Sequence, residues 1–243
     1  TAAAKPLFEN IAVEKLNQSV LYKIDSITTD AIDKLGMPGC VVLALKDGKI
    51  AYQKAFGSFT YEKKRPVALN TVYDLASVTK TCATTLSIMK LYEEGKLDLK
   101  KKLSDYLPQT LATNKSDLII EDILLHEAGL VAYIPFYKET LDAAGKPLAT
   151  MFSATVNDSF KIAVTDNLYM KNAWKDTIYK RILTSVVGPK GKYIYSDNDY
   201  IFLGKVVEQI SGMSMDKYVL QNFYEPMHLQ STGYDPLLRN SVD

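Results

Sequence analysis

Three serine–lysine pairs in this sequence have the spacing S-x-x-K, which a helix would turn into neighbouring side chains one turn apart. The pairs are Ser77 with Lys80, Ser87 with Lys90, and Ser214 with Lys217. A serine hydroxyl becomes a nucleophile when a neighbouring base takes its proton, and a desolvated lysine amine can be that base. Because serine and lysine are common residues, the spacing alone does not identify a nucleophile.

The sequence around the three pairs favours Ser77. Residues 71–76 lead directly into Ser77, and a helical pattern begins at that residue. A hydroxyl there lies beside the positive end of the helix dipole and beside backbone N–H groups that can stabilise an oxyanion. Ser87 falls in mid-helix, where bonding to a carbonyl one turn earlier is expected, and Ser214 has the position of a helix N-cap. A purely structural N-cap role would also explain Ser77.

Tyr195 is the second candidate for chemistry. It lies between an extended segment at 192–194 and a helix predicted from about 198 to 210. A phenol can act as a general base or acid when nearby positive charge lowers its pKa from about 10. The chain has 16 tyrosines, so a core aromatic at the end of a strand explains Tyr195 equally well when it is taken alone.

The elements that must position these residues are visible in the sequence pattern. Apolar residues at near-helical spacing predict a helix over residues 16–35. Asp47 and Gly48 separate two β-prone runs, at 40–45 and 50–56, and so predict a hairpin.

The rest of the chain is predicted to be mainly helical. The helix from 77 to 94 carries one apolar stripe, residues 97–189 are interpreted as a mostly helical lobe, and a further helix begins near Ser214. The stripe consists of Cys82, Leu86, Met89 and Tyr92. Since two strands alone are marginally stable, the pattern indicates a mixed α+β fold with an incomplete sheet.

Composition excludes several classes of function. The 243 residues carry 29 basic and 28 acidic side chains, so no overall field attracts nucleic acid. Cys40 and Cys82 form neither a disulfide framework nor a C-x-x-C pair. His126 and His228 are too few for a three-histidine zinc site, and we expect no metal and no cofactor. No apolar stretch reaches the roughly 18 residues that span a bilayer.

Several weak signals combine into a specific resemblance. The order and the flanks of these segments resemble the β-lactamase-related serine hydrolases, which include class C β-lactamases, D-alanyl-D-alanine carboxypeptidases (penicillin-binding proteins) and related esterases. The segments that carry the resemblance are residues 56–57, 73–80, 124–130, 195–204 and 225–233. The resemblance implies that Ser77 forms an acyl-enzyme and that Lys80 and Tyr195 exchange its proton.

Asp197 departs from the family pattern, which usually has asparagine at this position. A carboxylate there favours the charged form of Lys80 and works against a neutral-amine base. The substitution therefore favours Tyr195 as the base and argues against lactamase activity in particular. His126 matches a family segment in which it is expected to be structural, and His228 is expected to lie on the surface.

The resemblance also implies a domain plan. We expect a penicillin-recognising serine hydrolase fold: an antiparallel sheet flanked by helices, plus a mostly helical lobe. Residues 1–13 are interpreted as a linker-like segment and 14–243 as a partial β-lactamase-like domain, divided into 14–76 and 77–243. The family's third motif, Lys or His followed by Thr or Ser and Gly, is not recognised. Ser231-Thr232-Gly233 follows Gln230, and we expect the motif to lie downstream.

Two functions remain open from the sequence. The first is a serine hydrolase that cleaves an amide or ester of a small-molecule or peptide substrate, of the peptidase, esterase or β-lactamase type. The second is a non-catalytic binding or interaction module of the same fold, appended to another enzyme such as a glycoside hydrolase and following a fused upstream domain. The resemblance favours an extracytoplasmic location, in the periplasm or secreted.

Overall fold

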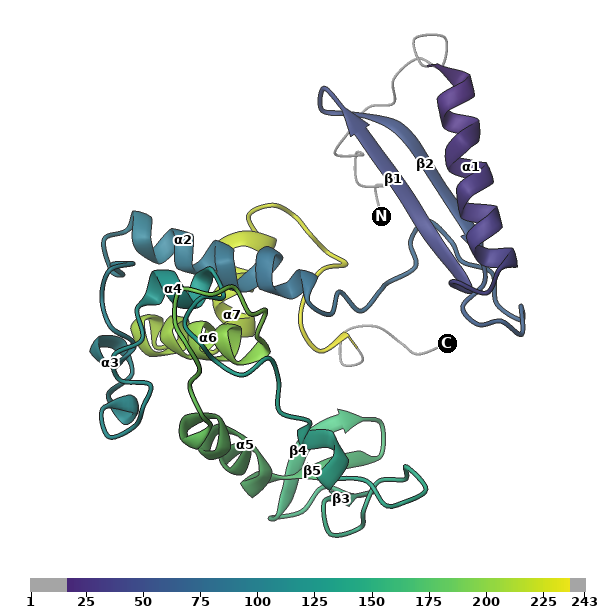
Figure 1. The fold of residues 1–243 in the computed structure, drawn as a ribbon. Coiled ribbons are helices and arrows are strands. Elements are labelled where there is room, and N and C mark those ends of the chain that lie inside the picture. Colours follow the sequence, from purple (N-terminus) through teal and green to yellow (C-terminus); the bar gives the residue numbers. More distant parts are fainter. Residues whose placement is uncertain (1–16, 237–243) are drawn as a thin grey trace. The chain divides into compact units, whose positions relative to one another are not determined.

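The computed structural model describes residues 17–236, so the predicted linker at 1–13 lies outside the described residues. The chain forms two compact units, which divide between Asp74 and Leu75 (Figure 1). None of the described helices combines the length and the apolar character needed to cross a membrane.

The first unit contains one helix and one β-hairpin. Asn17 caps the helix, because its side chain accepts a hydrogen bond from the Ser19 N–H at 3.1 Å. Asp47 and Gly48 both have positive φ, at 52° and 71°, as a tight hairpin turn requires. The elements are α1 (Gln18–Asp33), β1 (Gly39–Lys46) and β2 (Lys49–Gly57). The predicted helix and hairpin are therefore confirmed.

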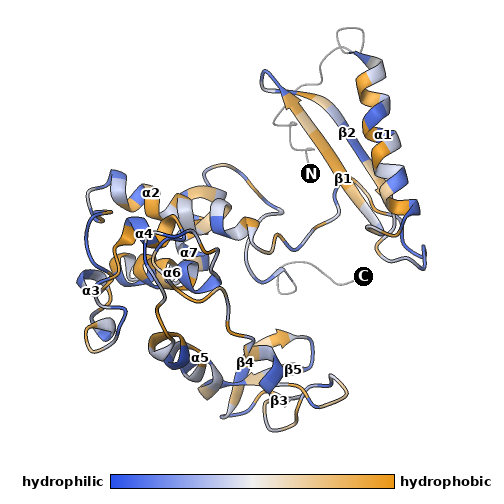
Figure 2. Ribbon diagram, viewed as in Figure 1, coloured by the Kyte–Doolittle hydropathy of each residue, from blue (hydrophilic) through white to orange (hydrophobic). Residues whose placement is uncertain are grey.

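The two strands pair antiparallel and pack against the helix through a polar contact. Gly39 lies opposite Gly57 in the register. The Tyr52 hydroxyl of β2 donates a hydrogen bond to Asp25 of α1. Figure 2 shows that β1 is hydrophobic along most of its length.

The second unit is built mainly from helices that pack around one central helix, α6 (Asp197–Ser211). One face of α6 is fully buried and forms the centre of the core, with Phe202, Leu203, Val206 and Val207 at 0% exposure. The helical segments of the second unit are η2 (Lys80–Thr85), α2 (Leu86–Glu93), α3 (Leu103–Tyr106), η3 (Pro108–Thr110), α4 (Ile120–Leu124), η4 (Phe136–Glu139), α5 (Asn172–Thr184), α6 (Asp197–Ser211), α7 (Met215–Val219) and η5 (Leu220–Tyr224).

A small three-stranded sheet interrupts the lobe that the sequence pattern indicated as mostly helical. Its strands are β3 (Phe152–Ser153), β4 (Phe160–Thr165) and β5 (Leu168–Lys171), in the antiparallel order β3-β5-β4. No residue of these strands is fully buried, and β3 and β5 are only two and four residues long, so they give a weak signal in the sequence pattern. The fold as a whole is mixed α+β, as predicted.

The apolar stripe predicted for the helix after Ser77 is wrong. Met89 and Tyr92 are 59% and 55% exposed, whereas Ile88 and Leu91 are buried. The buried positions 83, 84, 87, 88 and 91 recur at the spacing of a regular helix. The core-facing stripe therefore lies on the face of the helix opposite to the predicted one.

Gly129 provides a test of how two distant segments approach each other. It is buried with φ of 78°, and a Cβ there would lie 2.4 Å from the Gly188 carbonyl oxygen. We expect Gly129→Ala to lower the free energy of unfolding by about 3 kcal/mol, because backbone strain and a backbone clash combine.

Gly145→Ala is the matched control in urea denaturation. Gly145 has nearly the same φ, 76°, but nothing lies near its Cβ position. Its substitution should cost only the left-handed strain, about 1–2 kcal/mol. Equal losses in the two variants would contradict the close approach at Gly129.

Candidate active site

A strained turn presents Ser77 at the start of the helix. Ala76 has a positive φ of 42°, which is uncommon for a residue with a side chain. The Val78 N–H donates to the Leu75 carbonyl at 2.9 Å, and the Lys80 N–H donates to the Ser77 carbonyl at 3.0 Å. Ser77 itself is exposed. The turn therefore leaves its hydroxyl accessible to a substrate.

Lys80 links Ser77 to two residues from the other end of the unit. Its Nζ lies 3.2 Å from Ser77 Oγ and 2.6 Å from Asp197 Oδ1. The same Nζ is 5.0 Å from the centroid of the Tyr195 ring and 5.9 Å from that of Tyr200. The Lys80 side chain is 15% exposed, whereas that of Asp197 is 52% exposed. All four residues singled out in the sequence therefore meet at one partly open place.

Backbone hydrogen bonds bring Tyr195 and Asp197 to this place. The segment 188–197 runs beside the segment 126–132, where carbonyl groups accept bonds from four of its N–H groups. The N–H groups of Gly188, Gly191, Ile194 and Asp197 donate to the carbonyls of Gly129, Glu127, His126 and Ala132, at 2.7, 2.9, 2.8 and 2.8 Å. The position of Tyr195 is thus fixed by the chain on both sides of it.

Ser196 anchors the beginning of α6. Its Oγ accepts a hydrogen bond from the Asn198 N–H at 3.1 Å and donates to the Val131 carbonyl at 2.6 Å. This N-cap makes Asp197 the first residue of α6. Asp197 therefore lies at the positive end of the helix dipole, where a carboxylate is stabilised.

Within the cluster, the pKa values of the Lys80 amine and the Tyr195 phenol shift in opposite directions. Hydrogen bonds with Ser77 and Lys80 hold the pKa of the Tyr195 phenol below its ordinary value. Burial lowers the pKa of the Lys80 ammonium, but hydrogen bonds and charge from Asp197 and Tyr195 outweigh it, so this pKa lies above its ordinary value. Lys80 is therefore charged at neutral pH, which is the direction expected from a carboxylate at position 197.

Comparison with known proteins identifies the family. The family model described as Beta-lactamase matches residues 24–240. The chain belongs to the β-lactamase family.

Curated relatives of this β-lactamase family member include proteins named as an amidase and as a putative carboxypeptidase. An N-acetylmuramyl-L-alanine amidase from Bacillus subtilis (strain 168) is 31% identical over an alignment of 246 positions, which covers 96% of this chain and 50% of the relative. A putative D-alanyl-D-alanine carboxypeptidase from Escherichia coli (strain K12) is 30% identical over an alignment of 254 positions, which covers 98% of this chain and 53% of the relative. The chain thus spans about half the length of these relatives.

Solved structures show the same fold. An octameric penicillin-binding protein homologue from Pyrococcus abyssi matches with a TM-score of 0.63 at 24% identity, over 86% of this chain and 43% of that one. EstCE1, a hydrolase with promiscuous acyltransferase activity, matches with a TM-score of 0.63 at 25% identity, over 87% and 52%. The penicillin-recognising fold expected from the sequence is therefore confirmed.

In this β-lactamase family member, the serines of the two other S-x-x-K pairs occupy ordinary positions in helices. Ser87 is buried, and its Oγ donates to the Ala83 carbonyl at 2.8 Å, as expected for a serine in mid-helix. Its partner Lys90 pairs with Glu94 at 3.3 Å. Ser214 occupies the N-cap position of α7. Within residues 17–236, neither serine accepts a hydrogen bond from its lysine, as Ser77 does from Lys80.

Two buried titratable groups were not found from the sequence. Asp199 is 1% exposed, and its Oδ2 lies 2.7 Å from His126 Nδ1, which is itself buried. Lys115 is fully buried and hydrogen-bonds to Asn114 and to the Ser185 carbonyl; burial lowers its pKa to about 8. Charged residue types usually lie on the surface, so no sequence signal marked these two. His228 is exposed, as expected.

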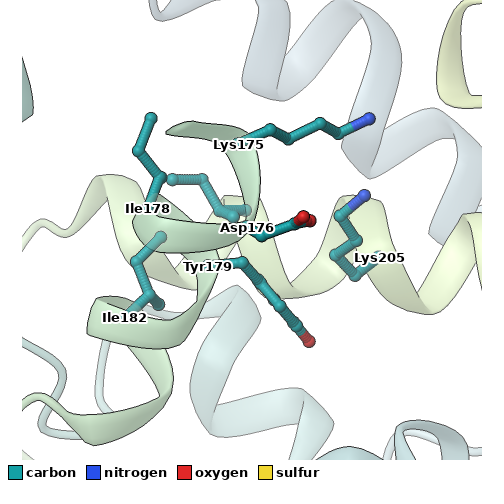
Figure 3. Close-up of a pocket in the computed structure, with 7 residues that line it drawn as sticks. Lys175, Asp176, Ile178, Tyr179, Ile182 and Lys205 are labelled. Carbon is teal, nitrogen blue, oxygen red and sulfur yellow. The ribbon is translucent and has the colours of Figure 1, made fainter. Parts of the chain in front are cut away.

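The described residues hold no group of three metal-ligating side chains. They do form a mainly apolar pocket of about 320 Å³ between α5 and α6 (Figure 3). Its wall consists largely of Ile178, Tyr179, Ile182 and Ile201, and the charged ends of Lys175, Asp176 and Lys205 gather at one side. None of the residues predicted for chemistry lines it, so this pocket is separate from the Ser77 cluster.

The cluster predicts how the Tyr195 phenol responds to its neighbour. Lys80→Ala removes a hydrogen bond and a positive charge that lower the pKa of this phenol, so the pKa should rise. The measurement is an NMR titration of protein labelled at the tyrosine ring, with Tyr195→Phe to assign the signal. Lys90→Ala, on the same helix but paired with Glu94, should leave the titration unchanged. A Tyr195 signal that titrates identically in wild type, Lys80→Ala and Lys90→Ala would contradict the contact.

Proposed function

We propose that this chain carries the acylation site of a serine hydrolase that cleaves an amide or ester through an acyl-enzyme on Ser77. The observation that supports it most is the convergence on Lys80 Nζ, which lies 3.2 Å from Ser77 Oγ, 2.6 Å from Asp197 and 5.0 Å from the centroid of the Tyr195 ring. Family membership adds support, since the relatives are named as an amidase and as carboxypeptidases.

In the first step the deprotonated phenol of Tyr195 takes the proton from Ser77 Oγ. The oxygen then attacks the carbonyl carbon of the substrate, and the electron pair of the C=O bond moves to oxygen to give a tetrahedral oxyanion. Backbone N–H groups at the start of the helix stabilise this charge. Tyr195 returns the proton to the departing amine or alcohol, which leaves Ser77 acylated.

In the second step water replaces the leaving group. Tyr195 takes a proton from the water, which attacks the acyl carbon and releases Ser77 with its proton restored. Lys80 stays charged throughout and stabilises the phenolate. Because Asp197 raises the pKa of the ammonium, the phenol and not the amine is the base in this proposal.

The proposed substrates are peptides of the bacterial cell wall. This follows from the relatives' names, N-acetylmuramyl-L-alanine amidase and putative D-alanyl-D-alanine carboxypeptidase. Substrates of this kind lie outside the cytoplasm, so we propose an extracytoplasmic location. Since the chain spans about half of each relative, the substrate and partners of the whole protein belong to the proposal as well.

Covalent labelling tests the nucleophile. A fluorescent fluorophosphonate or penicillin should label the protein, and Ser77→Ala should abolish the label. Ser87→Ala and Ser214→Ala, which alter the other S-x-x-K pairs, are matched controls and should keep it. Labelling that survives Ser77→Ala would contradict the assignment, and an unlabelled wild-type protein would favour a non-catalytic binding module.

Turnover tests the base and the substrate class. A D-alanyl-D-alanine peptide or a muramyl-L-alanine peptide should be hydrolysed faster than nitrocefin, with a p-nitrophenyl ester as a general acyl donor. Tyr195→Phe should lower kcat by about 10²–10⁴-fold, since it removes the proton acceptor. Tyr193→Phe alters an exposed neighbour and should retain activity. Equal effects of the two substitutions would argue against Tyr195 as the base.

A further inference from the structure

His126 holds the backbone on both sides of Tyr195. Its carbonyl oxygen accepts the Ile194 N–H at 2.8 Å, and its Nδ1 accepts the Ser196 N–H at 3.2 Å. The imidazole also packs on the Tyr195 ring, with the ring centroids 4.7 Å apart. His126 has a φ of 60°, a left-handed conformation that leaves its backbone and its side chain facing the same segment.

Asp199 is the second partner of the imidazole. Its Oδ2 lies 2.7 Å from His126 Nδ1, and its Oδ1 has no hydrogen-bond partner among the residues that the structure describes. The side chain is buried within the first turn of α6. An ionised carboxylate would leave a charged oxygen buried without a partner, which is costly, whereas a carboxylic acid avoids that cost.

The hydrogens of the His126 imidazole, the Asp199 carboxyl and the Ser196 N–H can be placed in one consistent arrangement. Because the Ser196 N–H points at Nδ1, this nitrogen presents a lone pair and carries no hydrogen. A carboxylate at the same nitrogen would then place two acceptors face to face at 2.7 Å, so we assign Oδ2 of Asp199 as a second donor, which shares the single lone pair of Nδ1 with the Ser196 N–H. The remaining hydrogen of the neutral imidazole is on Nε2.

The charges around the pair agree with this arrangement. Burial and the positive charge of Lys80 lower the pKa of His126, although Asp197 opposes them. Burial alone raises the pKa of Asp199 to about 8. The other titratable groups that face the imidazole are phenols, those of Tyr193, Tyr195 and Tyr200.

We propose that Asp199 is a neutral carboxylic acid in the folded protein and that it forms with His126 a positioning pair for Tyr195. The acid fixes the tautomer of His126, and the imidazole lone pair then holds the Ser196 N–H, so that the phenol stays beside Lys80. The kinetic part of this inference rests on the proposed function, whereas the protonation state of Asp199 does not.

The protonation state has a direct spectroscopic test. At pH 6, an infrared difference spectrum of wild type minus Asp199→Asn should show the stretch of a protonated carboxyl group. A difference spectrum that contains only carboxylate bands would overturn the proposal. Asp176→Asn, which alters an exposed carboxylate, is the matched control and should show carboxylate bands only.

Stability gives a second test that needs no activity. The pKa of Asp199 is about 8 in the folded protein, against an ordinary value of 3.8 for an aspartate side chain, so its contribution to stability is complete below about pH 4. This contribution is lost progressively as the pH rises to about 8. The urea concentration at the unfolding midpoint of Asp199→Asn should therefore rise relative to that of wild type between pH 5 and pH 8. A midpoint difference that does not change with pH would overturn the assignment.

Activity tests the positioning role. An asparagine amide can donate to Nδ1 as the acid does, so Asp199→Asn should keep kcat within about threefold and remove an activity loss near pH 8. Asp199→Leu lacks a donor and should lower kcat by about tenfold or more. If kcat fell as much in Asp199→Asn as in Asp199→Leu, the positioning role would be overturned. Failure of Ser77 labelling would reject the hydrolase proposal but leave both spectroscopic and stability tests valid.

Discussion

The backbone contact between residues 126–132 and residues 188–197 is the constraint on which the cluster depends. Lys80 and Asp197 are 117 residues apart in sequence, and no regular strand carries Tyr195 to its place. An irregular segment with buried polar groups is stable only where each group finds a partner. The carbonyls at 126, 127, 129 and 132 provide those partners. The close approach at Gly129, where a side chain would not fit, lets the two segments come near enough to bond.

The charges of Lys80 and Asp197 determine which group in the cluster is suited to accept a proton. A fully buried ion pair costs desolvation that its attraction barely repays, but the Asp197 side chain is 52% exposed and so keeps part of its hydration. Lys80 can therefore remain an ammonium against Asp197 while its charge acts on the phenol, whose ring centroid is 5.0 Å away. A neutral amide at position 197 would bond to Lys80 without raising its pKa as strongly. In the proposed mechanism the carboxylate therefore leaves proton acceptance to Tyr195.

The sequence predicted those parts of the structure that local rules determine. Hydrophobic periodicity predicted α1, Asp47-Gly48 predicted the hairpin, and a helix close to the bounds of α6 was also expected. The meeting of Ser77, Lys80, Tyr195 and Asp197 came from the family resemblance, since no local rule joins residues so far apart. The bond between His126 and Asp199 was missed because an acidic residue in the first turn of a helix usually faces solvent. Its burial depends on packing that only the tertiary structure contains.

The three S-x-x-K pairs show that the same spacing can occur in very different local structures. Ser77 differs from Ser87 and Ser214 by the backbone around it: a left-handed residue precedes it and π-helical turns follow it. Left-handed strain at a residue with a side chain costs about 1–3 kcal/mol. The helix that continues from the turn offsets this cost by burying Ile88 and Leu91 in the core. The core of the unit therefore sustains the distortion that exposes the Ser77 hydroxyl beside Lys80.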